Sequence, residues 1–145
     1  MKPYTDSGIL VKLYVRERNS VEAARTLCRY PHLEINRLHE LEILNTFRTL
    51  EGLNLITPIQ RTASEHALES DIIAGRLRRV ESDWPAIFRE SLELSRLYGA
   101  RTLARSLDIL HVAAAIAAAA GAFITGDKRQ HEIALLAGLD SRYIE

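Results

Sequence analysis

Apolar residues recur along the chain with two different periods, and their alternation predicts short strands interleaved with helices. Apolar positions three and four apart indicate a helix, whereas a short apolar run that ends at a turn indicates a buried strand. Strands are predicted at residues 4–5, 32–35, 77–80, 122–125 and 142–144. Helices are predicted at residues 7–14, 21–30, 37–50, 58–74, 84–99, 107–120 and 129–137. This order predicts an α/β fold of three layers, in which a short, mostly parallel sheet is flanked by helices.

Several helix ends carry signals of their own. Helix 58–74 has the clearest start, because Thr57 can cap it, Pro58 suits its first position and Gln60 completes a capping box. Asp83 and Ser106 are predicted to cap the helices that follow them. Glycines are predicted to end helices 37–50, 84–99 and 107–120. Helix 37–50 is expected to bury one stripe of leucines, namely Leu38, Leu41, Leu44 and Leu50.

Length and composition restrict the class of protein. A chain of 145 residues, with 47% hydrophobic and 26% charged residues, is typical of one globular domain, here residues 1–145. Nineteen basic and nineteen acidic residues cancel, so no overall field draws the protein to nucleic acid. The longest apolar run, 112–120, is too short to span a bilayer, and the N-terminus lacks signal-peptide features. We therefore expect a cytoplasmic protein without membrane association.

Cys28 is the only cysteine. A single cysteine excludes an intramolecular disulfide and a metal site built from cysteines. Its position within a predicted helix indicates a small buried residue.

Four acidic residues, Asp6, Glu42, Asp108 and Asp127, each lie where an apolar run meets a helix or a turn. A carboxylate among apolar neighbours is costly unless it is paired or bound to metal. Asp6 and Asp127 follow predicted strands, at the sheet edge where α/β folds bind ligands. Glu42 and Asp108 would have to reach that edge from helices, and the sequence alone leaves open whether they do.

If the fold gathers these acids, their repulsion requires a cation. Two carboxylates about 4 Å apart repel by roughly 4 kcal/mol at an effective dielectric constant near 20. A site built only of oxygen ligands favours Mg²⁺ or Mn²⁺, whose commonest use is on phosphate esters. The four acids therefore predict a metal site for phosphate chemistry.

Each acid also has a purely structural interpretation. Asp6 could serve only as a helix cap, and Asp127 only as a turn residue after a glycine. Asp108 lies in the first turn of its helix, where the helix dipole favours a carboxylate. Glu40 is the competing candidate for the second acid. Residues two positions apart on a helix point to different sides, so only one of Glu40 and Glu42 can face the site. We take Glu42 as the site residue and Glu40 as a solvated surface charge.

Other polar residues near these acids have two interpretations. His111 lies one turn after Asp108 and is interpreted as a packing or hydrogen-bonding residue, because a metal could supply the reactive water. Ser7 and Thr125 could hydrogen-bond carboxylates that hold the metal, or simply cap helices. The basic run at 76–79 is compatible with an RNA path and equally with a solvated edge.

The contexts of the four acids, in this order and at this spacing, resemble a PIN domain of the VapC toxin type over nearly the whole chain. The matching blocks are Tyr4-Thr5-Asp6-Ser7, Leu41-Glu42-Ile43-Leu44-Asn45, Leu107-Asp108-Ile109-Leu110-His111 and Ile124-Thr125-Gly126-Asp127. The resemblance implies a Mg²⁺-dependent endoribonuclease that cleaves RNA phosphodiesters with a metal-activated water. It further implies the toxin of a type II toxin–antitoxin pair, and a homodimer.

The resemblance also assigns roles to the acids. Asp6 and Asp108 would hold Mg²⁺ (or Mn²⁺) most directly, and Glu42 and Asp127 would complete the pocket. Position 129 is arginine where some relatives carry another acid, so the site is expected to rely on four carboxylates.

A small antitoxin is the expected protein partner. We expect it to insert an Arg or Lys side chain among the carboxylates. It could also pack a helix against Leu10, Leu13 and Tyr14, if these residues are not core.

Two other functions are alternatives for these residues. The first is a catalytically weak PIN-type binding module that acts through a protein partner, and metal-dependent RNA cleavage would exclude it. The second is a phosphatase for small substrates. It is disfavoured because the chain has neither a phosphate-binding glycine loop nor a nucleophilic Asp-x-Asp pair.

Overall fold

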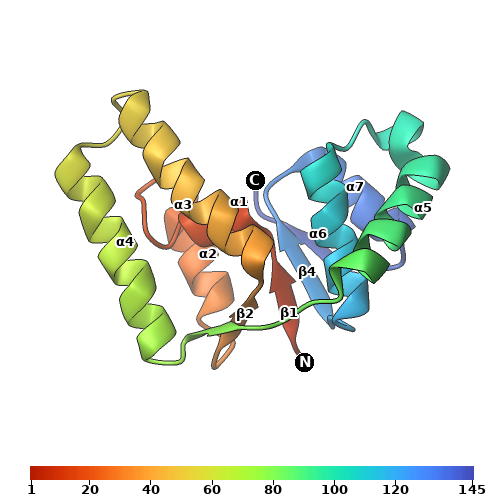
Figure 1. Cartoon of the computed structure of the whole chain (residues 1–145), viewed down its shortest axis with the longest axis horizontal. Helices are drawn as coiled ribbons and strands as arrows, with labels where there is room; N and C mark the ends of the chain where they lie inside the picture. Colours follow the sequence, from red (N-terminus) through yellow and green to blue (C-terminus); the bar gives the residue numbers. More distant parts are fainter. The chain divides into compact units, whose positions relative to one another are not determined.

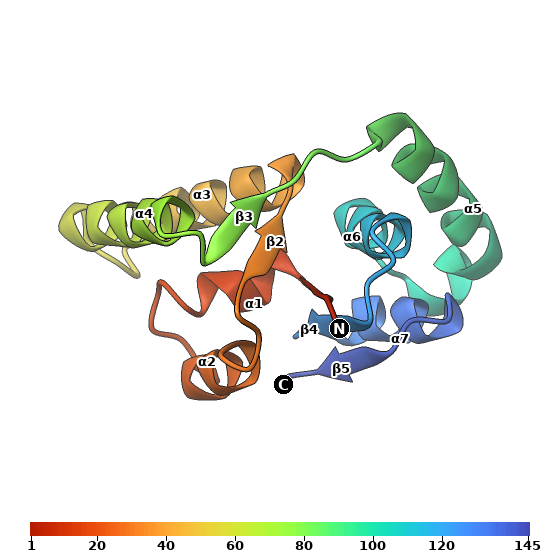
Figure 2. The same cartoon turned by 90° about the horizontal axis from the view of Figure 1, so that it is seen from below.

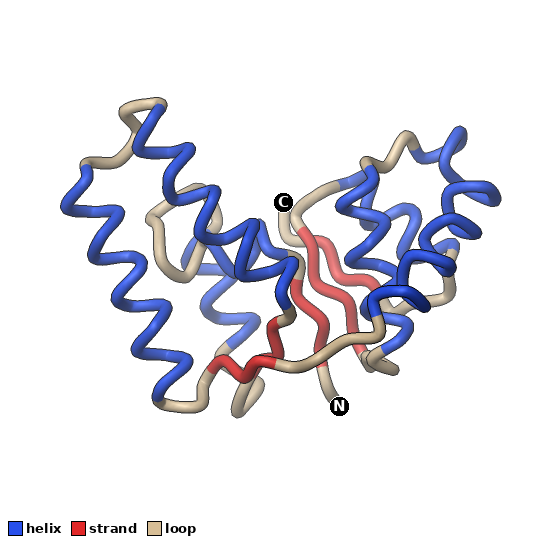
Figure 3. The backbone as a smooth tube through the Cα atoms, viewed as in Figure 1, coloured by secondary structure: helices blue, strands red, loops and turns tan.

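Three parallel strands form the sheet of one of two units into which the chain divides. The computed structural model describes all residues 1–145, with Met1–Asp6 and Ser82–Glu145 in unit 1 and Ser7–Glu81 in unit 2. In unit 1, β1 (Pro3–Thr5), β4 (Ala122–Thr125) and β5 (Ser141–Tyr143) pair in the order β1-β4-β5 (Figure 3). Every residue of the central strand β4 is buried, in agreement with its apolar sequence up to Thr125.

Three helices complete unit 1. They are α5 (Trp84–Thr102), α6 (Ser106–Ala117) and α7 (Lys128–Leu136). Helix α7 connects β4 to β5 and packs against both strands, while α6 packs against α5 and α7 (Figure 2). Residues 109–115 of α6 are all buried, as expected for a helix that is apolar on every side. This packing fixes the ends of β1, β4 and α6 within one unit.

Unit 2 contains the remaining elements: α1 (Ser7–Val11), α2 (Ser20–Leu27), β2 (Leu33–Ile35), α3 (Arg37–Gly52), α4 (Pro58–Ile73) and β3 (Leu77–Arg79). Strands β2 and β3 are parallel, and α3 and α4 lie side by side (Figure 1). The capping box predicted for α4 is present, because the Thr57 and Gln60 side chains each accept a hydrogen bond from the other residue's main-chain N–H.

The predicted fold class is confirmed, with one difference in the sheet. All strand pairs are parallel and helices flank the strands, as the alternation of elements predicts. The five strands form two hydrogen-bonded sheets, of three and two strands, rather than one. The single domain over 1–145 stays a prediction.

Helix α3 buries a different face from the predicted leucine stripe. Its buried residues are His39, Ile43 and Phe47, spaced four apart. Leu41 is 67% exposed, so the predicted stripe is wrong. Helix α3 packs against α1, α4 and β2, and this tertiary packing outweighs the leucine pattern.

The three residues expected near α1 to contact a partner helix differ in burial. Leu10 is fully buried, and Leu13 and Tyr14 are half-buried in the turn after α1. The Tyr14 ring contacts Phe47 edge-on, and its hydroxyl donates a 2.6 Å hydrogen bond to Asp71. Burial raises the pKa of the Tyr14 phenol, and the Asp71 hydrogen bond raises it further, so the phenol stays a neutral donor. Leu10 therefore belongs to the core of unit 2, whereas docking of a partner helix against Leu13 and Tyr14 stays a prediction.

Several predicted helix ends are displaced. Helix α5 continues through Gly99 to Thr102 and ends where Leu103 adopts φ 57°. Helix α6 ends at Ala117, before Ala119 adopts φ 52° and well before Gly121. Glycine spacing misplaced both ends because non-glycine residues make the left-handed turns here.

Three smaller predictions also differ from the structure. Arg105 rather than Ser106 occupies the cap position of α6, without a side-chain cap bond. Helix α2 stops at Leu27, earlier than predicted. Cys28, at the C-cap position after Leu27, is exposed rather than buried.

Candidate active site

Asp6 lies at the carboxyl end of β1, where its main chain continues the sheet ladder. Its N–H donates to the carbonyl oxygen of Ile124 at 2.9 Å. The side chain is 14% exposed, and its Oδ1 accepts a 3.2 Å hydrogen bond from Nε2 of Gln130. The carboxylate is thus fixed at the strand end, as predicted, by an amide that the sequence prediction did not include.

Asp108 lies in the first turn of α6 and is partly exposed. Its main-chain carbonyl accepts a 3.3 Å hydrogen bond from the same Gln130 Nε2 that contacts Asp6. One amide nitrogen therefore joins the end of β1 to the first turn of α6. The structure brings Asp6 and the backbone of Asp108 together through this nitrogen.

Asp127 caps α7, the helix that follows β4. Its Oδ1 accepts a 2.8 Å hydrogen bond from the main-chain N–H of Gln130, and the residue is otherwise exposed. Its own N–H donates to Oγ1 of Thr125 at 3.0 Å. Asp127 therefore has a structural function as a helix cap, and its role as a metal ligand stays a prediction.

Gln130 is the residue that sequence reasoning missed. It is fully buried, and its Oε1 accepts a 2.5 Å hydrogen bond from the Thr125 hydroxyl. The sequence held a signal, since Asp127 and Gln130 are spaced as a capping box, but that motif predicts a glutamine turned back to its own helix start. Instead, the Thr125 hydroxyl accepts the hydrogen bond from the N–H of Asp127. The Gln130 side chain is therefore not needed there, and its amide points toward Asp6.

His111 is a buried hydrogen-bonding residue, in agreement with its interpretation from sequence. Its Nδ1 lies 2.7 Å from the Tyr4 hydroxyl, and it has no exposed surface. The Nε2 atom lies 3.9 Å from Oδ1 of Asp6, beyond hydrogen-bonding distance. Tyr4 stacks in turn on Phe123 with ring centroids 5.8 Å apart. His111 therefore packs beside Asp6 and supports the end of β1.

Glu42 lies in unit 2, on α3. Its Oε1 accepts a 2.9 Å hydrogen bond from the Ser7 hydroxyl. Ser7 directly follows Asp6 in the chain, and the contact agrees with the prediction that Ser7 could hold a site carboxylate. Because Asp6 and Glu42 belong to different units, their meeting in one site stays a prediction.

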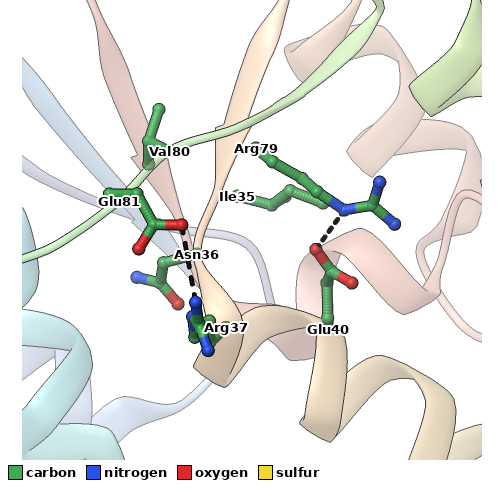
Figure 4. Close-up of a pocket in the computed structure, with 7 residues that line it drawn as sticks. All are labelled: Ile35, Asn36, Arg37, Glu40, Arg79, Val80 and Glu81. Atoms are coloured by element: carbon green, nitrogen blue, oxygen red, sulfur yellow. Dashed lines mark hydrogen bonds and ion pairs between the residues drawn. The ribbon is translucent and has the colours of Figure 1, made fainter.

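Glu40, the competing acid, lies in a separate pocket of unit 2 (Figure 4). Its Oε1 accepts a 2.6 Å hydrogen bond from Nε of Arg79, and Arg37 pairs with Glu81 at 3.6 Å. The pocket has a volume of about 320 Å³ and is lined by Ile35, Asn36, Arg37, Glu40, Arg79, Val80 and Glu81. Two cations are matched here by two carboxylates, so the pocket offers no net charge to a phosphate. Glu40 is thus a paired surface charge, and Arg79 of the basic run is engaged with it.

Asp6 and Asp108 of unit 1 are the candidate ligands for a magnesium-type cation. Within either unit, no group of three or more His, Cys, Asp or Glu side chains is arranged to hold a metal ion. Mg²⁺ needs fewer protein ligands than that, since it is usually bound by one or two carboxylates together with waters and substrate phosphates. Asp6 supplies one carboxylate held by a neutral amide, and Asp108, whose carbonyl oxygen accepts from the same amide, is the candidate for the second.

Comparison with known proteins assigns the family. The model of the PIN domain family matches residues 4–136, so the chain belongs to the PIN domain family. PIN domains are generally nucleases, and they typically use divalent metals. This confirms the family predicted from the four acidic blocks.

A solved structure has the same fold. It is the crystal structure of VapBC2 from Rickettsia felis bound to a DNA fragment from their promoter. The likeness has a TM-score of 0.67 at 16% identity and covers 99% of this chain and 98% of that one. A search of curated proteins finds no significant match. None of the helices has the length and apolar character needed to cross a membrane.

Proposed function

We propose that the chain is a metal-dependent endoribonuclease of the VapC type, with its active site at Asp6 and Asp108 and with Glu42 and Asp127 completing it. The observation that carries the proposal is the shared Gln130 amide, which holds the Asp6 carboxylate at 3.2 Å and the Asp108 carbonyl at 3.3 Å. In a family of nucleases, a buried amide that holds one carboxylate next to the helix turn carrying a second acid supports metal-assisted phosphodiester cleavage.

The chain's own residues bind and orient the reactants. Asp6 and Asp108 would hold Mg²⁺ or Mn²⁺, while Ser7 would orient Glu42 through its 2.9 Å hydrogen bond. When bound, the cation supplies a water of lowered pKa and neutralises charge on the phosphodiester. His111 stays buried beside Asp6, where it supports the strand end rather than exchanging protons with RNA.

The proposal is tested by incubating the purified protein with an unstructured RNA in the presence of different divalent metal ions and measuring RNA cleavage. We expect cleavage with Mg²⁺ or Mn²⁺, none in excess chelator, and weak cleavage with Ca²⁺, whose larger and looser shell positions a water poorly. Undiminished cleavage in chelator would rule out the metal mechanism. If no ion supports cleavage, the catalytically weak binding module becomes the better description.

A small antitoxin is the proposed partner, and a homodimer the proposed assembly. The solved structure of similar fold is VapBC2 bound to DNA, which supports a two-protein system. An Arg or Lys side chain inserted beside Asp6 could pair with carboxylates and displace the cation. A second copy could cover Phe88 and Leu92 of α5, which are 53% and 72% exposed. A cytoplasmic location stays a prediction.

The partner proposal predicts a growth phenotype. Expression of this chain alone should stop growth of its host, whereas co-expression with the product of an adjacent small reading frame should restore growth. The measurement is colony number with and without the second gene, and Asp6→Asn serves as the inactive control. A chain that is harmless alone, or that no adjacent product inhibits, would instead point to a stand-alone RNA-processing nuclease.

A further inference from the structure

The side chain of Gln130 has every polar atom engaged, and the hydrogen bonds fix its orientation. The Thr125 hydroxyl accepts the N–H of Asp127 at 3.0 Å, so its single proton is free to go to Oε1 of Gln130. With Oε1 fixed toward Thr125, Nε2 must point the other way. Its two hydrogens face Oδ1 of Asp6 and the carbonyl oxygen of Asp108.

We propose that Gln130 is a positioning residue for the metal site: its buried amide sets the distance between the Asp6 carboxylate and the turn of α6 that carries Asp108, and thereby sets the affinity for the divalent cation. This inference rests on the proposed function only for the identity of the site. It adds to the site a residue other than the four acids. The hydrogen bonds of this residue connect β4 to the end of β1 and to α6.

An amide suits this position better than an acid would. It is neutral, so it does not compete with Asp6 and Asp108 for the cation, and it donates two hydrogen bonds where a carboxylate could donate none. A carboxylate at 3.2 Å from Oδ1 of Asp6 would add repulsion in a buried place. Because Gln130 has no exposed surface, water cannot replace the lost donors if the amide is removed.

The chain contains only two glutamines, Gln60 and Gln130, which gives the experiment an internal control. Gln60 is exposed and completes the capping box of α4 in the other unit. In the ¹⁵N-labelled wild-type protein, we expect the Gln130 side-chain amide hydrogens to exchange slowly with solvent. Titration with Mg²⁺ should shift their signals, with the same midpoint as the main-chain amide of Asp6. The Gln60 side-chain signals should not move.

The matched variants are Gln130→Met and Gln60→Met, which keep side-chain length and remove the amide. We expect Gln130→Met to weaken Mn²⁺ binding, measured by calorimetry, by about 10- to 100-fold, as for residues that orient metal ligands. Gln60→Met should change it less than about twofold, although it removes a helix cap. Circular dichroism shows whether each variant is folded.

The outcomes separate this inference from the proposed function. The inference is overturned if metal binds while the Gln130 signals do not move. It is also overturned if a folded Gln130→Met variant binds the metal with unchanged affinity. Either result leaves the nuclease proposal standing. Coupled Gln130 shifts without RNA cleavage support the inference and contradict the nuclease. Absence of any shift at Asp6 with Mg²⁺ contradicts both. If Gln130→Met does not fold, the wild-type titration alone decides.

Discussion

Replacing Asp6 with asparagine is expected to lower metal-dependent RNA cleavage by about 10³-fold, because the metal contributes several kcal/mol to catalysis and each 1.4 kcal/mol is tenfold. The amide keeps an oxygen that can accept the hydrogen bond from Gln130, so the surrounding network should survive. Asp108→Asn should have a similar effect. The measurement is the single-turnover cleavage rate at saturating Mg²⁺.

The matched control is Asp140→Asn in the same unit. Asp140 is exposed and pairs with Arg142 at 3.3 Å, and a surface pair of this kind contributes at most about 1 kcal/mol. Its cleavage rate should equal that of the wild type. Asp6→Asn should also melt no lower than the wild type without metal, since it removes a negative charge from the acidic site. Near wild-type cleavage by Asp6→Asn would make the site assignment wrong.

The sequence predicts the strands and the best-marked helix start because their signals are local. Strand β4 is a short apolar run between a glycine and a Gly-Asp turn, and the structure places it at the predicted residues. Thr57, Pro58 and Gln60 specify the start of α4 through contacts within four residues. The order of parallel elements then follows from the alternation of strands and helices.

Features decided by contacts distant in sequence could not be predicted in this way. The buried face of α3 carries His39, Ile43 and Phe47 rather than the leucines, because packing against α1, α4 and β2 decides which face is covered. Gln130 matches a capping box by spacing, and only the position of Thr125 shows why its amide faces Asp6 instead. The role of Gln130 in the site therefore depends on the meeting of four segments of unit 1, namely β1, β4, α6 and α7.

Two buried phenylalanines allow the single-domain prediction to be tested by stability. Phe123 of β4 stacks on Tyr4 in unit 1, and Phe47 of α3 contacts Tyr14 in unit 2, both with no exposed surface. Truncation of either to alanine is expected to cost about 3–5 kcal/mol, from lost burial and the cavity that remains. For a chain of this length that lowers the melting temperature by roughly 10 °C.

If residues 1–145 fold as one domain, both variants should lower the same single transition in calorimetry by similar amounts. Phe88, the only other phenylalanine, is 53% exposed, so Phe88→Ala is the control and should change stability by about 0.5 kcal/mol or less. Two separate transitions, with Phe123→Ala lowering one and Phe47→Ala the other, would contradict the single domain. In that case Glu42 would sit on an independently folding unit, and its participation with Asp6 and Asp108 would need the two units to be brought together by the cation or the RNA.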